Sequence, residues 1–161
     1  MAGWQLPPLI HHISAEDDWP SLVHLVAKEA GMEEGLVQEL LRFGAVYLSK
    51  PLIPGLRKQR AGNVEGMGKA VRVTSNEAVP RGAYVRVHAN PKRHLAANGV
   101  DWSNRILAEE HGLVVVDKPA GVPTVPTVDN LVESVLFRVQ EVVRQPLLST
   151  SRLDTCTSGE T

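Results

Sequence analysis

The sequence predicts an α+β protein with two parts: a small domain of paired helices and strands, then a second domain with further strands and one helix. Apolar residues recur at helical spacing between residues 21 and 44. They alternate with polar residues from Ala83 to His88, as on a strand with one buried face. An apolar run from Leu113 to Val116 has the length of a strand. We therefore expect a lead-in over residues 1–20, a first domain over 21–90, a linker over 91–103 and a second domain over 104–161.

The composition is that of a soluble globular protein, with 43% apolar and 22% charged residues among 161. Cys156 is the only cysteine, which excludes an intrachain disulfide and favours a reducing compartment. No apolar run approaches the ~20 residues that a membrane-spanning helix needs, and the first residues lack the features of a signal or transit peptide. The pair His11–His12 has no Cys or acidic partner at ligand spacing, so we expect no metal site.

The prolines and polar residues of 1–20 disfavour regular structure in this lead-in. Two short helices are expected after it. Gly31 can end the first helix and Gly44 the second, because glycine readily adopts the left-handed conformation that terminates many helices. The apolar stripes of the two helices comprise Leu22, Val23, Leu25, Val26 and Ala30, and Leu36, Val37, Leu40 and Leu41.

Three strands are expected in the rest of the first domain, over residues 45–49, 71–74 and 83–88. Residues 50–70 are rich in proline, glycine and cations, which indicates a mobile loop or insertion. In the third strand the two faces are Ala83, Val85 and Val87, and Tyr84, Arg86 and His88.

A strand pair opens the second domain, with residues 105–108 and 113–117 placed around a turn at 109–112. The four prolines and glycines at positions 119, 121, 123 and 126 then predict a long extended loop.

One amphipathic helix follows, with an apolar face over residues 131–142. Asn130 and Glu133 resemble a capping box that would open it. Pro146 ends the helix, and residues 147–153 are predicted to form the last strand.

Positive charge is concentrated in one segment although the formal net charge is only −1. Residues 42–94 hold eleven Lys or Arg against two Glu, which indicates a segment that faces a polyanion. A solvated charged loop is the alternative explanation. Interleaved Tyr47, Tyr84 and His88 favour contact with RNA, and we expect no DNA partner. The candidate RNA-binding residues are Arg42, Lys50, Arg57, Lys58, Arg60, Arg81, Arg86, Lys92 and Arg93.

Two motifs in the second domain resemble those of a known enzyme family. Residues 106–121 end in Asp-Lys-Pro-Ala-Gly and resemble the opening hairpin of the RNA pseudouridine synthase catalytic domain. Residues 152–159, Arg-Leu-Asp-Thr-Cys-Thr-Ser-Gly, are similar to the Arg-Leu-Asp-x-x-Thr-Ser-Gly signature that holds the catalytic aspartate of the RluA-type members. Both motifs occur in the family's order, separated by one amphipathic helix.

The resemblance implies an isomerase that converts uridine to pseudouridine in rRNA or tRNA without a cofactor, with Asp154 as the catalytic residue. Arg152 would bind the RNA backbone or help to flip the target nucleotide, and it shares a strand face with Asp154 unless a turn intervenes. Thr157 and Ser158 would shape the turn and contact substrate. Cys156 has no adjacent His to activate it, so we expect a packed or turn residue.

Lys118 has two interpretations, as a catalytic or phosphate-binding lysine or as a loop residue that serves the fold beside Pro119. We favour the structural one. Two positions depart from the family pattern: Ser151 stands where His is frequent, and Thr155 where a charged residue often follows the aspartate.

The front part resembles an alpha-L type RNA-binding domain. The resemblance is carried by the helix pair, by the junction at residues 43–46 that follows it, and by the strand at residues 81–85. The resemblance therefore implies such a domain followed by the incomplete start of a mixed, mainly antiparallel pseudouridine synthase catalytic domain. The Val-Pro-Thr-Val-Pro loop and the Thr-Cys-Thr-Ser-Gly ending resemble plant plastid-type members, which favours a chloroplast or other organelle over the cytoplasmic alternative.

The last residue, Thr161, follows Gly159 closely, whereas family members continue into further strands. We therefore expect a fragment that is inactive by itself, whose full-length parent is monomeric, and whose terminal strands lack partners. Two alternatives remain open at this point: a non-catalytic RNA-binding protein and an inactive truncated product.

Overall fold

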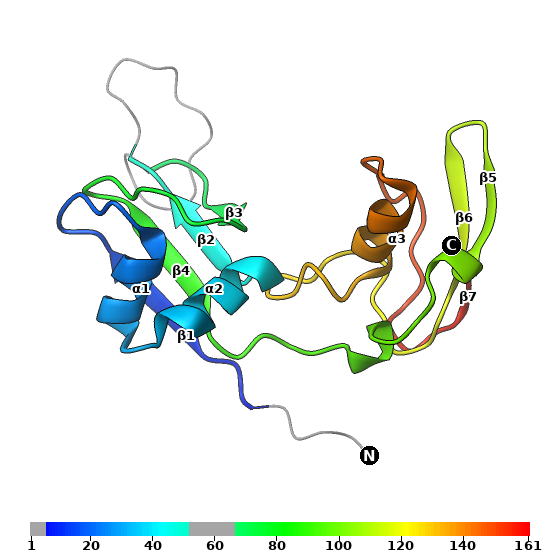
Figure 1. Ribbon diagram of the computed structural model, residues 1–161, viewed down its shortest axis with the longest axis horizontal. Coiled ribbons are helices and arrows are strands. Elements are labelled where there is room, and N and C mark those ends of the chain that lie inside the picture. The colour runs from blue at the N-terminus through cyan, green and yellow to red at the C-terminus, as the bar shows by residue number, and fades with distance from the viewer. Residues whose placement is uncertain (1–5, 52–66) are drawn as a thin grey trace. The chain divides into compact units, whose positions relative to one another are not determined.

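The computed structural model describes residues 6–51 and 67–161. The chain divides into two compact units, Met1–Pro91 and Lys92–Thr161 (Figure 1). Both units combine helices with antiparallel strands, so the predicted α+β class is confirmed. The candidate cations Arg57, Lys58 and Arg60, with most of the loop predicted over residues 50–70, lie outside the described residues.

A four-stranded antiparallel sheet forms one layer of the first unit, in the order β1-β4-β2-β3. Its strands are β1 (Ile10–Ser14), β2 (Val46–Ser49), β3 (Val71–Val73) and β4 (Tyr84–His88). The prediction of an irregular lead-in over residues 1–20 is wrong for β1, which pairs with β4 along its whole length. The physical reason is that Ile13 is buried in the core while its neighbours face outward, a strand alternation that the polar residues around it concealed.

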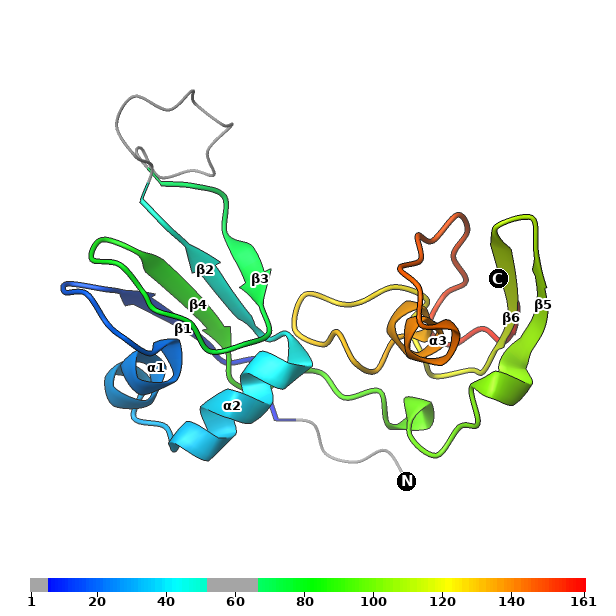
Figure 2. The same ribbon diagram turned by 45° about the horizontal axis from the view of Figure 1, so that its top comes forward.

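Helices α1 (Leu22–Ala30) and α2 (Glu34–Phe43) cover one face of this sheet (Figure 2). Ser21 caps α1 by accepting a hydrogen bond of 3.1 Å from the N–H of His24. Gly31 and Gly44 end the two helices in the left-handed conformation, with φ of 65° and 70°. The predicted helix ends are thus confirmed. Glycine suits both positions because a residue with a β-carbon is strained at such a φ.

The core of the first unit lies between the helices and the sheet. Ala83, Val85 and Val87 are fully buried in it, whereas Tyr84 and Arg86 lie on the opposite, helix-free face. The predicted two-faced strand is therefore confirmed. From the helices the core receives Leu22, Val23, Leu25, Val26, Val37, Leu40 and Leu41.

A three-stranded antiparallel sheet organises the second unit, in the order β5-β6-β7. Its strands are β5 (Ile106–Glu110), β6 (Leu113–Lys118) and β7 (Gly159–Glu160). The predicted strand pair is confirmed, and its turn consists of His111 and Gly112, both at positive φ.

The last predicted strand is wrong, because residues 147–153 are not in a strand. Leu148 is 92% exposed, so its side chain has no core to enter. The backbone of Leu153 bonds to the hydroxyl of Thr124 instead of to a neighbouring strand. The last strand is β7, which pairs with Asp117 and Lys118 of β6.

Helix α3 (Val135–Val143) begins later than its apolar pattern predicted, with Ser134 as its N-cap. Asn130 and Glu133 do form reciprocal hydrogen bonds of 2.8 and 3.0 Å. These bonds stabilise a turn over residues 131–134 that precedes the helix. They do not cap the first helical turn, because the Glu133 carboxylate accepts from the side chain of Asn130 and from the backbone N–H of His94. None of the helices in the described part of the chain has the length and apolar character that a bilayer crossing requires.

The predicted linker over residues 91–103 belongs largely to the second unit. It contains the short helix η1 (Leu95–Ala97) and precedes η2 (Ser103–Arg105). Ala97 and Trp102 are buried in the core formed by Val116, Val122, Val135 and Val139. The boundary therefore falls after Pro91.

Candidate functional site

Asp154, the predicted catalytic residue, lies in an irregular loop between α3 and β7 and has an exposed side chain. Its backbone carbonyl accepts a hydrogen bond of 3.0 Å from the N–H of Thr157, which closes a turn over residues 154–157. Thr157 and Ser158 are exposed beside it. The turn therefore presents a carboxylate and two hydroxyl groups to solvent in a short stretch.

This loop is fastened to the extended loop that follows β6. The Thr124 hydroxyl donates to the carbonyl of Leu153 at 3.0 Å and accepts from the N–H of Leu153 at 3.1 Å. The N–H of Gly121 donates to the carbonyl of Thr155 at 2.7 Å. The fold thus brings the two motifs together and fixes the backbone on either side of Asp154.

Lys118 holds the same junction from inside. Its side chain is 0% exposed, and its Nζ donates to the carbonyls of Val122 at 2.7 Å, Pro119 at 3.2 Å and Thr155 at 3.4 Å. Burial lowers the pKa of Lys118, and electrostatic interactions with Cys156 and Asp154 oppose this decrease. A lysine so enclosed is not available to a phosphate, which supports its structural interpretation.

Gly121 is required by this arrangement. Its φ is 86°, and a β-carbon at this position would lie 3.0 Å from the β-carbon of Ala96. Thr124 and Gly121 lie in the proline-rich loop and were not among the predicted site residues. An expectation that this loop packs against the second motif would have indicated Thr124 and Gly121 as contact residues.

Arg152 and Asp154 do not form an ion pair with each other or with any other described residue. The prediction that they share a strand face fails, because the backbone here is irregular and turns after Asp154. Both side chains are exposed, so the Arg152 guanidinium is available to a ligand in solution. An apolar hollow nearby is lined mainly by α3, β6 and residues 147–151, and Asp154 is not part of it.

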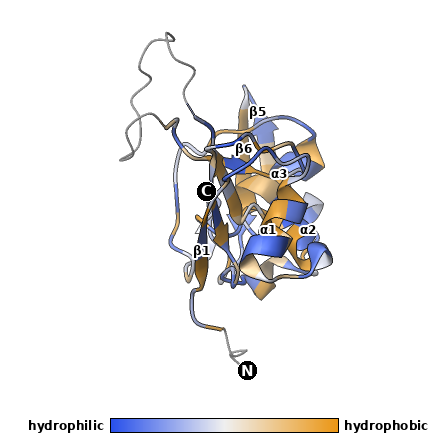
Figure 3. Cartoon of the chain, turned by 90° about the vertical axis from the view of Figure 1, so that its left-hand side faces the viewer, coloured by the Kyte–Doolittle hydropathy of each residue, from blue (hydrophilic) through white to orange (hydrophobic). Residues whose placement is uncertain are grey.

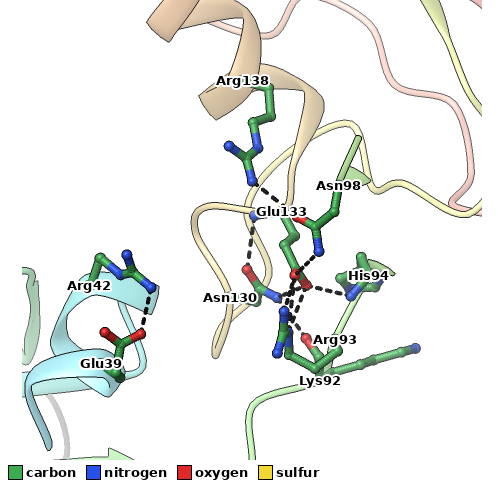
Figure 4. A network of polar contacts seen from close by, with 9 residues as sticks. All are labelled: Glu39, Arg42, Lys92, Arg93, His94, Asn98, Asn130, Glu133 and Arg138. Atoms are coloured by element: carbon green, nitrogen blue, oxygen red, sulfur yellow. Dashed lines mark hydrogen bonds and ion pairs between the residues drawn. The ribbon is translucent and has the colours of Figure 1, made fainter. Parts of the chain in front are cut away.

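A buried carboxylate organises the segment that begins the second unit (Figure 4). Glu133 accepts hydrogen bonds from Arg93 Nη2 at 2.6 Å and from the N–H of His94 at 2.6 Å. Burial alone would raise the pKa of Glu133, but the bonds from Arg93, His94 and Asn130 lower it to about 2. The same ion pair raises the pKa of Arg93.

This network gives one predicted RNA-binding residue a structural role. Arg93 is bound through two nitrogens to the carboxylate of Glu133. Its contact with RNA stays a prediction. Lys92 keeps an exposed side chain, and its backbone N–H donates to Asp129. Burial, and secondly the charge of Lys92, lower the pKa of His94.

The described cations of the first unit lie on several different elements. Arg42 on α2 pairs with Glu39 at 2.5 Å, and Lys50 pairs with Glu77 at 3.2 Å. The Arg81 side chain is exposed in a turn before β4. Arg86 lies on the helix-free face of the sheet. Within the described ranges no cluster of three His, Cys, Asp or Glu could hold a metal ion.

Two curated proteins are similar to this chain along nearly its whole length. It is 31% identical over 183 residues to a protein of Arabidopsis thaliana named RNA pseudouridine synthase 6, chloroplastic. It is 30% identical over 179 residues to the protein of the same name from Oryza sativa subsp. japonica. The matches cover 98% and 95% of this chain but 39% and 37% of those proteins, so the chain spans about two fifths of their length. No family model matches the chain, and no solved structure matches it significantly.

Proposed function

We propose that this chain is part of an RluA-type RNA pseudouridine synthase, an isomerase that converts uridine to pseudouridine in structured RNA, with Asp154 as its catalytic residue. One observation carries the proposal. Two motifs about thirty residues apart are joined by hydrogen bonds around Lys118, and the junction presents the Asp154 carboxylate to solvent. The similarity to proteins named pseudouridine synthases supports the same reaction.

The reaction breaks the bond between the base and its sugar, turns the base and rejoins it through carbon. An ionised aspartate can attack the sugar or the base, or remove a proton from the sugar, and needs no cofactor for these steps. Its direction must be fixed, because a small displacement of a reacting group lowers the rate strongly. The bonds of Leu153 and Thr155 to the neighbouring loop support that requirement on both sides of Asp154.

Arg152 is proposed as the substrate-binding cation beside Asp154. Its exposed guanidinium can bind a phosphate of the target strand through two parallel hydrogen bonds. Such a contact would offset the few kcal/mol that taking a nucleotide out of its stack costs. Thr157 and Ser158 are proposed to contact the same nucleotide through their hydroxyl groups.

The first unit is proposed as an alpha-L type RNA-binding domain. Its support is a helix pair on an antiparallel sheet, together with the exposed cations Arg42, Lys50 and Arg81 and the half-buried Arg86. The second unit is then the first part of the catalytic domain. The rRNA or tRNA substrate, the monomeric state and the location in a chloroplast are parts of the same proposal, the last supported by the printed names of the relatives.

The test is conversion of uridine in plastid rRNA and tRNA transcripts by a protein extended to the length of the relatives. Pseudouridine is measured by mass spectrometry of nucleosides. We expect conversion by the wild type, none by Asp154→Ala, and an unchanged rate for Asp17→Asn, which removes an exposed carboxylate of the first unit. Conversion by Asp154→Ala at the wild-type rate contradicts the proposed role. RNA binding without conversion by the wild type favours the non-catalytic alternative.

A further inference from the structure

One row of side chains crosses all four strands of the first unit on the face that the helices leave open. The strand register places His12 beside Arg86, Arg86 beside Tyr47, and Tyr47 beside Arg72. Their neighbours along the strands, such as Ile13, Val46 and Val87, are packed in the core. Because side chains alternate along a strand, the row faces away from α1 and α2. Figure 3 shows both helices together on one side of β1.

Tyr47 orders the two arginines of this row. The guanidinium of Arg86 lies 4.6 Å from the centre of the Tyr47 ring, and that of Arg72 lies 5.4 Å from it. Arg72 also donates to the Tyr47 hydroxyl at 2.8 and 3.2 Å. Contacts of a cation with an aromatic ring hold a flexible side chain in place without neutralising its charge. Tyr47 therefore positions two positive charges on one surface.

The charge on this face is one-sided. No Asp or Glu occurs in any of the four strands. The exposed Arg42 and Lys50, by contrast, are paired with Glu39 and Glu77.

We propose that the helix-free face of the first unit is an RNA-binding surface, on which Arg86 contacts a phosphate of a single strand and Tyr47 acts as its positioning residue. The inference rests on the proposed function for the nature of the polyanion and adds the place where it binds. Phosphate contacts of this kind supply affinity and orientation but little sequence choice. The surface is therefore expected to hold the RNA and to leave the choice of uridine to other groups.

The experiment measures binding of the 161-residue chain to a fluorescein-labelled oligouridine by anisotropy, over a range of salt concentrations. Arg86→Ala is expected to weaken binding about tenfold and to lower the salt slope by about 1. Lys28→Ala removes one positive charge from an exposed position on α1, which the proposed surface does not include, and is expected to change the affinity less than about twofold. Equal losses for both variants would contradict the inference, because they would indicate a general effect of net charge.

Substitutions of Tyr47 separate positioning from charge. Tyr47→Leu is expected to weaken binding about two- to fivefold, since it removes the ring that orders Arg86, with no change in the salt slope. Tyr47→Phe retains the ring and is expected to lose less affinity. Arg86→Lys, which keeps the charge but not the planar group, is expected to lie between wild type and Arg86→Ala, and it serves as the informative variant if Tyr47→Leu does not fold.

The outcomes distinguish this inference from the proposed function. RNA binding that survives Arg86→Ala and Tyr47→Leu unchanged overturns the surface and leaves the enzyme proposal in place. Failure of the wild-type chain to bind RNA at low salt overturns the surface and the RNA-binding role of the first unit together. Loss of catalysis in an Asp154 variant has no bearing on either binding result.

Discussion

The buried Glu133 network allows a quantitative prediction about the stability of the second unit. Glu133 is 1% exposed and accepts hydrogen bonds from Arg93, His94, Asn98 and Asn130. The substitution Glu133→Gln keeps the size of the side chain but removes the negative charge and replaces one acceptor with a donor. Several bonds to a charged group are thereby weakened or lost.

The pKa of Glu133 gives the magnitude and the sign. Its pKa falls from 4.5 to about 2 on folding, and one pKa unit corresponds to about 1.4 kcal/mol, so the ionised side chain contributes about 3 kcal/mol. Because the pKa is lower in the folded chain, this contribution is fully present above pH 4.5 and is lost as the pH falls toward 2. The difference in the free energy of unfolding between wild type and Glu133→Gln should therefore decrease by about 3 kcal/mol as the pH falls from 4.5 to 2.

Urea unfolding from pH 6 to pH 2.5 measures this difference, with the indole N–H signal of Trp102 as the probe. Trp102 is suitable because it is buried in the core of the second unit and donates to the carbonyl of Ala97. Glu141→Gln is the control, since Glu141 is exposed and its ion pair with Arg138 should contribute little. A difference that stays constant with pH, or an equal loss in the control, would refute the reasoning.

The remaining predictions concern the junction around Asp154. Lys118→Met should lower the free energy of unfolding by about 2 kcal/mol, since it leaves buried carbonyls without a donor, and urea titration of the same unit checks this; an unchanged midpoint would show that the ammonium is dispensable. Gly121→Ala should lower the free energy of unfolding by about 1–3 kcal/mol, because Gly121 has a positive φ and a β-carbon there would lie against Ala96. Gly35→Ala in α2, where a β-carbon meets no atom within 4 Å, should raise it by up to ~1 kcal/mol. Equal changes in melting temperature for the two variants would exclude the steric explanation. Arg152→Ala in the extended protein should lower kcat/KM about tenfold by weakening phosphate binding; steady-state kinetics that match the wild type would remove Arg152 from the site.

Local chemistry determined the features that the sequence predicted correctly. The ends of α1 and α2 follow from glycines at positions 31 and 44, whose conformational freedom is independent of the rest of the fold. The hairpin of β5 and β6 follows from two apolar runs on either side of a turn with Gly112. The two motifs were identified by resemblance, and neither their contact in the fold nor the bonds of Thr124 and Lys118 were predicted from the sequence.

Tertiary contacts determined the features that the sequence did not reveal. Glu133 was interpreted as a helix cap, but its carboxylate forms an ion pair with Arg93, forty residues away in the sequence. Residues 147–153 have the composition of a strand, yet the hydroxyl of Thr124 occupies the backbone groups of Leu153. β1 was missed because only one of its five residues, Ile13, is buried. In the first two cases a residue distant in the sequence outweighed the local pattern.

The most direct test of the central claim is a single-turnover measurement with Asp154→Asn in the extended protein, in which RNA affinity and uridine conversion are followed on the same sample. Asparagine keeps the shape of the side chain and removes its charge. We expect an unchanged affinity and no detectable pseudouridine. Conversion at the wild-type rate with the asparagine in place would contradict it.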